Sequence, residues 1–138
     1  MPRKKRSGKM KYEFAPDLFE IAKDIILKLR LDHVKLDSIS CIRSYGTKSR
    51  GTIARCHALS KVMQMSLNRK GFYVLEFLSE RFDKMWEDDK IKTIIHEIMH
   101  IPNTFGGGFK HHDYVNEANI NKFFRVYKNL KARRDYFS

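Results

Sequence analysis

The stretch from Asp88 to Pro102 is the feature of this sequence that most constrains its fold. Its apolar residues recur with the period of an α-helix, acidic residues stand at its start and a proline closes it. The apolar set is Ile91, Ile94, Ile95, Ile98 and Met99. At about 100° per residue, His96 and His100 lie within about 40° of each other and roughly opposite Ile91. We therefore predict an amphipathic helix that carries two imidazoles on the face turned away from the core.

These two histidines belong to the pentapeptide His96-Glu97-Ile98-Met99-His100, which has the form H-E-x-x-H. One helical turn separates them, and this spacing lets two ring nitrogens reach one ion at about 2.0 to 2.1 Å. Glu97 projects beside the pair and is placed to hold a water next to the ion, as general base and acid. The pattern predicts one Zn²⁺ per chain, with His96 and His100 as ligands and Glu97 as the catalytic residue.

A catalytic zinc ion needs a third protein ligand and one open coordination position. The glycines at Gly106–Gly108 supply a sharp turn after the helix, and two histidines follow them. We prefer His112 as the third ligand, because it stands beside Asp113 at the predicted start of the last helix. His111 is an alternative, and Glu117 is another because it would complete a His-His-Glu zinc site.

The whole chain predicts an α+β domain. Pro16 and Asp17 suit the first turn of a helix, and Asn68–Gly71 suits a turn between two strands of a hairpin. The predicted elements are an N-terminal helix over 16–31, strands over 36–42, 52–67 and 72–78, the helix over 88–101 and a C-terminal helix from 113. The three strands are expected to form a small, mainly antiparallel sheet.

Positive charge is concentrated at the two ends of the chain, whose formal net charge is +12. The first eleven residues include six basic residues and no acidic one. They predict a flexible basic tail over 1–11, ahead of a single domain over 12–138. Predicted polyanion contacts in the tail are Arg3, Lys4, Lys5 and Arg6. A second basic cluster near the C-terminus contains Lys122, Arg125, Lys128, Lys131, Arg133 and Arg134. Both ends favour non-specific contact with nucleic acid, although no base-reading motif is present.

Three further features predict a cytoplasmic protein without a membrane partner. Charged residues interrupt every apolar run before it reaches the roughly 18 to 20 residues of a membrane-spanning helix. The basic tail is not followed by the apolar segment of an export signal. Cys41 and Cys56 have no CxxC spacing, which indicates reduced thiols and neither a disulfide framework nor a thiolate zinc site.

Two segments of the chain, His96–Pro102 and Gly106–Asp113, resemble the small zinc metallopeptidases of archaea and phages, which are relatives of the SprT-like zincins. Weaker similarity to that family extends upstream, over Arg43–Gly46, Ala54–His57, Tyr73–Glu76 and Ser79–Asp83. The resemblance covers about residues 12 to 130 and leaves out the basic tail.

This resemblance implies a minimal zincin fold, in which a helix and a small sheet pack over the active-site helix. It also implies that His96, His100 and His112 bind zinc and that Glu97 is the catalytic acid and base. The sequence departs from the metzincin pattern, because the sixth position after His100 is Gly106 and not a histidine.

The leading functional prediction is zinc-dependent hydrolysis of peptide bonds, with Glu97 taking a proton from water and passing it to the leaving amine. Candidates for stabilising the oxyanion are Tyr114, Tyr45 and Arg55. If the strand over 72–78 is an edge strand above the cleft, an extended or unfolded polypeptide would pair with it as an additional strand.

Two other functions compete with this prediction. One is a basic, nucleic-acid-associated zinc protein, including a protease that acts on DNA-bound proteins in the manner of some SprT-like relatives. The other is a zinc-binding regulatory module without turnover. His33 and His57 each stand alone in the sequence and are predicted not to bind the metal.

Overall fold

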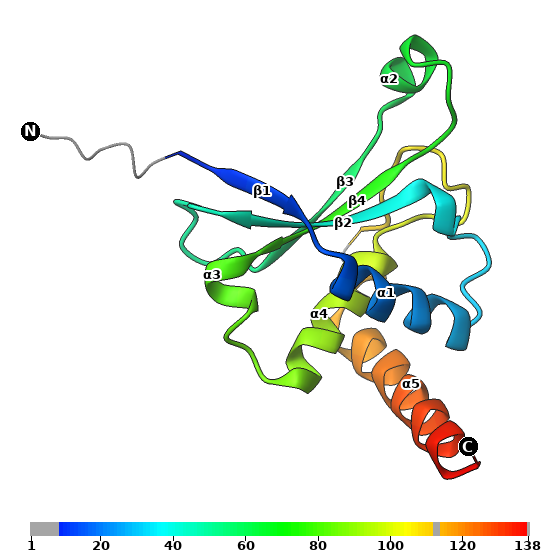
Figure 1. Cartoon of the computed structure of the whole chain (residues 1–138). Helices are drawn as coiled ribbons and strands as arrows, with labels where there is room; N and C mark the ends of the chain where they lie inside the picture. Colours follow the sequence, from blue (N-terminus) through cyan, green and yellow to red (C-terminus); the bar gives the residue numbers. More distant parts are fainter. Residues whose placement is uncertain (1–8, 112–113, 138) are drawn as a thin grey trace, which may run out of the picture.

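The computed structural model describes residues 9–111 and 114–137 (Figure 1). Helices and strands are interspersed along this part of the chain, which confirms the predicted α+β class. The elements in chain order are β1 (Lys11–Phe14), α1 (Pro16–Lys28), the 3₁₀ helix η2 (Leu36–Ser38), β2 (Ile39–Tyr45), β3 (Ala54–Ala58), α2 (Lys61–Ser66), β4 (Tyr73–Leu78), α3 (Ser79–Phe82), α4 (Glu87–Met99) and α5 (Glu117–Phe137).

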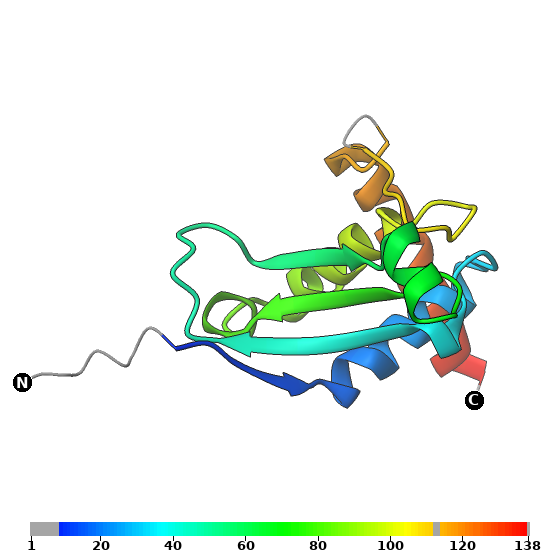
Figure 2. The same cartoon turned by 90° about the horizontal axis from the view of Figure 1, so that it is seen from above.

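The four described strands form one mixed sheet in the order β1-β2-β4-β3 (Figure 2). The two central strands, β2 and β4, run parallel, with Ile39 opposite Tyr73 and Ser44 opposite Leu78. β1 and β3 each run antiparallel to their neighbour and form the two edges. The edge strand β3 also contacts α4, the helix that carries the H-E-x-x-H sequence.

One face of the sheet is covered by helices, and this packing fixes the position of α4. Figure 1 shows α1, α4 and α5 on the same side of the sheet. Ile25 of α1, Leu75 and Phe77 of β4 and Ile94 of α4 are fully buried in the core between these layers. Each large apolar side chain that is buried in this way contributes about 1.5 to 3 kcal/mol. The apolar stripe predicted for α4 is therefore the part of the helix that holds it against the sheet.

The structure corrects the predicted sheet in two respects. Lys11–Phe14, at the border between the predicted tail and the predicted domain, form a fourth strand, so that the sheet has four strands in place of three. The strand over 72–78, which would have to be an edge strand to pair with a substrate, is the internal strand β4, and the edge strand beside α4 is β3. A run that is apolar on both faces suits a central strand, and in β4 even Glu76 and Leu78 are buried. Residues 1–8 of the predicted tail lie outside the described residues.

A further correction concerns the segment predicted as one long strand over 52–67. It contains the short strand β3 and then the helix α2. The Ser60 side chain caps this helix by accepting a hydrogen bond from the backbone N–H of Met63 at 3.2 Å. The antiparallel pairing of β3 with β4 agrees with the predicted hairpin, but α2 and the turn at Asn68–Gly71 together form its connection.

The helix boundaries differ from the predictions by a few residues. α1 ends at Lys28 and α4 spans Glu87–Met99, while α5 starts at Glu117. Asp113, predicted to cap the last helix, lies outside the described residues. No helix in the described ranges is both long and apolar enough to cross a membrane.

Candidate metal centre

The last turn of α4 brings the predicted zinc ligands together beside the edge strand β3. The ring centroids of His96 and His100 are 5.0 Å apart, and the two ring planes meet at 61°. Both rings border a hollow of about 410 Å³ that Glu97 and the β3 residues Ala54 and Cys56 also line. The structure thus juxtaposes the two histidines and the glutamate that the sequence singles out.

The His100 ring is held in one orientation by the loop that follows α4. Its Nδ1 lies 2.8 Å from the backbone carbonyl oxygen of Lys110. A carbonyl only accepts hydrogen bonds, so Nδ1 carries the hydrogen and Nε2 is the nitrogen with the lone pair. The backbone N–H of Lys110 donates in return to the carbonyl of His100 at 2.8 Å. This reciprocal contact gives the imidazole the tautomer and the orientation that a metal ligand requires.

Glu97 is a buried carboxyl group next to one of these rings. Only 6% of the residue is exposed, and burial raises the pKa of its carboxyl group to about 7. Its Oε2 lies 4.0 Å from Nε2 of His96. A carboxyl group with a pKa near neutrality exchanges its proton readily, which suits a general base and acid.

A second hollow continues the cleft on the other side of the same residues. It measures about 570 Å³ and shares Ala54, His96 and Glu97 with the first. Its walls include Thr93 of α4 and Glu117 of α5. The catalytic candidates therefore lie at the middle of a cleft that follows the β3 edge in both directions.

Two of the three candidates for the third ligand belong to the described residues, and both line the cleft. His111 is exposed and lines the hollow that contains His96 and His100. Glu117 lines the neighbouring hollow at the start of α5. His112 lies outside the described residues, directly after His111 in the chain. Among residues 9–111 and 114–137, no three metal-binding side chains form a group, so the identity of the third ligand stays a prediction.

The glycine-rich loop is held against the sheet by Tyr73, a contact that the sequence did not reveal. The Tyr73 hydroxyl accepts a hydrogen bond from the N–H of Gly107 at 2.9 Å and donates to the carbonyl of Gly108 at 2.8 Å. Gly71 also allows a close approach, since a Cβ there would lie 2.1 Å from the carbonyl oxygen of Phe105. These contacts position the loop that leads to Lys110 and His111.

The three predicted oxyanion donors are in different places. Arg55 borders the catalytic hollow, although its Nη1 lies 3.5 Å from the carboxylate of Glu76. The Tyr45 hydroxyl donates to Glu13 at 2.5 Å, and Tyr45 does not line either part of the catalytic cleft. Tyr114 lines a separate hollow behind α4.

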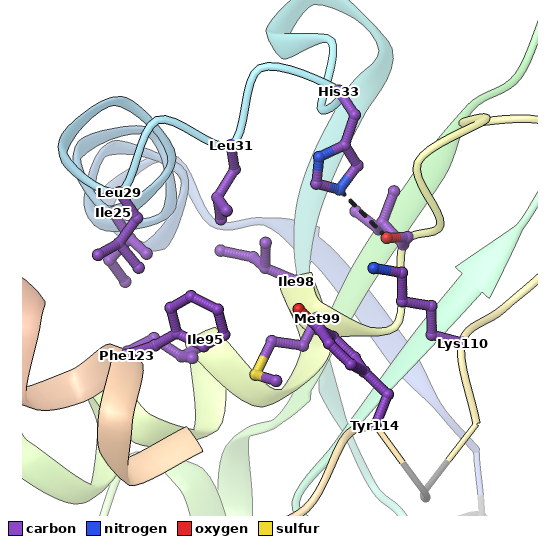
Figure 3. A pocket seen from close by; sticks show the side chains of 11 residues that line it. Ile25, Leu29, Leu31, His33, Ile95, Ile98, Met99, Lys110, Tyr114 and Phe123 are labelled. Carbon is purple, nitrogen blue, oxygen red and sulfur yellow. Dashed lines mark hydrogen bonds between the residues drawn. The ribbon is translucent and has the colours of Figure 1, made fainter. Parts of the chain in front are cut away.

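That separate hollow is shown in Figure 3, where Tyr114 and Lys110 stand near His33 and apolar side chains such as Phe123 form the walls. Its volume is about 20 Å³, which is room for about one water molecule. His33 Nε2 lies 3.2 Å from the carbonyl of Ile101. The hollow is too small for a peptide, and we assign no substrate to it.

His57, the other histidine predicted not to bind metal, is also engaged elsewhere. Its Nε2 donates to Oε1 of Glu76 at 2.7 Å. The alternation of side chains along β3 places His57 and Arg55 on one face of the sheet, and Cys56 lies with α4 on the other.

Comparison with known proteins identifies a matching protein family. The family model described as "Putative phage metallopeptidase" matches residues 10–133, which is most of the chain. No curated protein and no solved structure matches the chain.

Proposed function

The chain belongs to this phage metallopeptidase family, and from that premise we propose that it is a zinc-dependent peptidase in which Glu97 is the general base and acid. The observation that carries the proposal is the juxtaposition of His96 and His100 with the buried carboxyl group of Glu97. The family supports a metal-dependent peptide hydrolase, and the choice of zinc and of these residues is our inference.

The residues present fit a zinc ion. Two neutral imidazoles are donors that zinc accepts, and the Lys110 carbonyl keeps the His100 ring in the required tautomer. His96 and His100 would hold the ion with a third donor, for which His112 is the predicted residue and His111 and Glu117 are the alternatives. When bound, zinc acts as a Lewis acid that lowers the pKa of water and polarises a carbonyl group.

Glu97 has the environment that proton transfer in this reaction demands. Its carboxylate takes a proton from the attacking water, and the resulting carboxylic acid delivers that proton to the nitrogen of the leaving amine. Because burial raises the pKa of Glu97 to about 7, both protonation states are accessible near neutral pH. Glu97 lines both hollows of the cleft.

The substrate that fits the cleft is an extended polypeptide. β3 is an edge strand, and it borders both hollows that meet at His96 and Glu97. The backbone groups of an edge strand that do not pair within the sheet are available to a further strand. An unfolded or flexible segment that pairs with β3 would pass directly beside Glu97.

A single substitution tests this proposal. We expect the Glu97→Gln variant to retain its zinc and to lose hydrolysis of a fluorescently labelled unfolded protein such as reduced casein, by about 10²- to 10⁴-fold. Zinc content and cleavage are measured on the same preparation. Glu87→Gln is the matched control, because Glu87 is an exposed carboxylate at the start of the same helix. Turnover by Glu97→Gln at the wild-type rate would refute the mechanism.

A further inference from the structure

The face of the sheet opposite α1 and α4 is uncovered over much of its area. In Figure 2 the strands lie in front of these helices, and only α2 lies in front of the strands, at one end. The pairing register assigns the side chains to this face, because partners in neighbouring strands share a face. The members of this face that are not fully buried, which we call the open face, are Tyr12, Phe14, Ser40, Ile42, Arg55, His57, Val74 and Glu76. Ser44 and Leu78, at the end near α3, are buried.

Two aromatic side chains dominate the β1 edge of the open face. Tyr12 is 64% exposed and Phe14 is 78% exposed. They are two residues apart on one strand, so they point to the same side and their Cα atoms are separated by about 7 Å. Ile42, opposite Phe14, and Val74 on the next strand are half-buried and continue the apolar surface. Two adjacent exposed rings on a sheet surface indicate a binding surface.

The open face exposes the guanidinium of Arg55 and the imidazole of His57. Arg55 and His57 expose 41% and 51% of their side chains. Glu76 is the one acidic residue among the members of the open face; it is only 5% exposed and lies within hydrogen-bonding distance of His57. Moreover, the sequence between Asp37 and Glu76 has no acidic residue at all. No member of the open face is an exposed carboxylate, although the exposed Glu20 of α1 lines a hollow with Phe14 and Ser40 at the β1 edge.

From these contacts we propose that the open face binds single-stranded nucleic acid. Unpaired bases stack on exposed aromatic rings such as Tyr12 and Phe14, and the phosphate backbone follows neighbouring cations. Arg55 supplies such a cation on β3, and Lys9 and Lys11 lie shortly before Tyr12 in the sequence. A duplex hides the faces of its bases within the stack and cannot use the rings. This site differs from the predicted polyanion contacts of the basic termini, because it reads base faces as well as charge.

The binding of a fluorescein-labelled single-stranded oligonucleotide of about 20 nucleotides tests the proposal. We expect the full chain to bind it more tightly than the corresponding duplex at the same salt concentration. Replacing both rings, with Tyr12→Ala and Phe14→Ala, should weaken binding by about 5- to 150-fold per ring. The slope of log K against log salt should not change, since no cation is removed.

Two matched variants make the test specific for the open face. Trp86→Ala removes a ring that is 82% exposed but lies at the start of α4, on the covered side of the sheet, and it should bind as the wild type does. The pair Tyr12→Phe and Phe14→Tyr keeps both rings and should keep the affinity. Thermal melts of all variants check that the exposed substitutions leave the fold intact.

Several outcomes would overturn the proposal. They are equal affinity for single strand and duplex, affinity that is unchanged in the folded double alanine variant, and binding to phosphatidylserine vesicles with none to the oligonucleotide. No step of the experiment requires hydrolysis. Its result is therefore independent of whether the chain is a peptidase.

Discussion

Glu97 and Glu76 are almost equally buried, at 6% and 5% exposed, and each lies near a histidine, but their pKa values shift in opposite directions. Burial raises the pKa of Glu97 to about 7. Burial acts in the same sense on Glu76, but the Ser44 hydroxyl, the hydrogen bond from His57 and the charge of Arg55 together outweigh it, and the pKa is lowered. Burial by itself therefore does not decide the charge of a carboxyl group.

The difference separates a carboxylate that neighbouring side chains keep ionised from the one that we propose to be catalytic. Glu76 lies on the open face, where two cationic or donating side chains of β3 stabilise its ionised form. Glu97 lies on the helix side, in a cleft lined by histidines and the small residue Ala54. A metal ion bound at His96 and His100 would add positive charge beside Glu97 and stabilise its ionised form.

The largest effect expected from this comparison is on metal binding. His96→Ala should abolish the binding of zinc, because it removes one of two ligands on the same helical turn. His57→Ala should leave about one zinc per chain, because His57 belongs to the Glu76 pair. Metal content per chain, measured after purification without chelator, checks both. If His57→Ala lost zinc and His96→Ala retained it, the metal site would be at His57 and Glu76 and not at His96 and Glu97.

The same measurement tests the third ligand. His112→Ala is expected to lose zinc, whereas His111→Ala and Glu117→Gln are expected to keep it. Loss in only one of the latter two variants would transfer the role to that residue.

A smaller effect concerns the stability of the metal-free protein. The pKa of Glu97 rises from its ordinary 4.5 to about 7 on folding, which corresponds to about 3 kcal/mol. The folded state favours the protonated form of Glu97. The free energy of unfolding is therefore highest below pH 4.5, decreases as the pH rises from 4.5 through about 7, and is constant at higher pH. Glu97→Gln stays neutral and should be more stable than the wild type by about this amount at pH 8, with no such gain at pH 4. Urea unfolding in the presence of chelator at both pH values checks the sign.

The smallest effect is expected on the stability of the protein when Glu76 is replaced. Its lowered pKa gives a stabilisation that is present above the ordinary pKa and is lost as the pH falls through the folded value. Glu76→Gln removes the ionised partner of His57 and Arg55 and should cost about 1 to 3 kcal/mol at pH 7. Urea unfolding should show this loss, and zinc content should be unchanged. If Glu76→Gln were as stable as the wild type, the contacts of Arg55 and His57 with this carboxylate would not contribute to the stability of the fold.

Much of the helical part of the fold was predictable from local pattern. The 3.6-residue period of α4 and the proline at the start of α1 specify a buried stripe and a helix start without reference to the rest of the chain. The positions of the strands were harder to predict, because an apolar run is compatible with either an edge strand or a central strand of a sheet. The exposed residues of α2 and the short strand β1 carry no periodic signal strong enough to define them.

The sequence by itself determined that His96, Glu97 and His100 lie together, because they are neighbours on one helical turn and need only local geometry to meet. The tertiary structure alone decided what surrounds them. It placed β3 at the edge beside Glu97, brought the Lys110 carbonyl to the His100 ring and set His57 against Glu76 on the opposite face. These contacts join residues that are 10 to 40 or more positions apart, such as His100 with Lys110 and Ala54 with Glu97. They depend on strand order and on loop closure, and no local period in a single sequence encodes either of them.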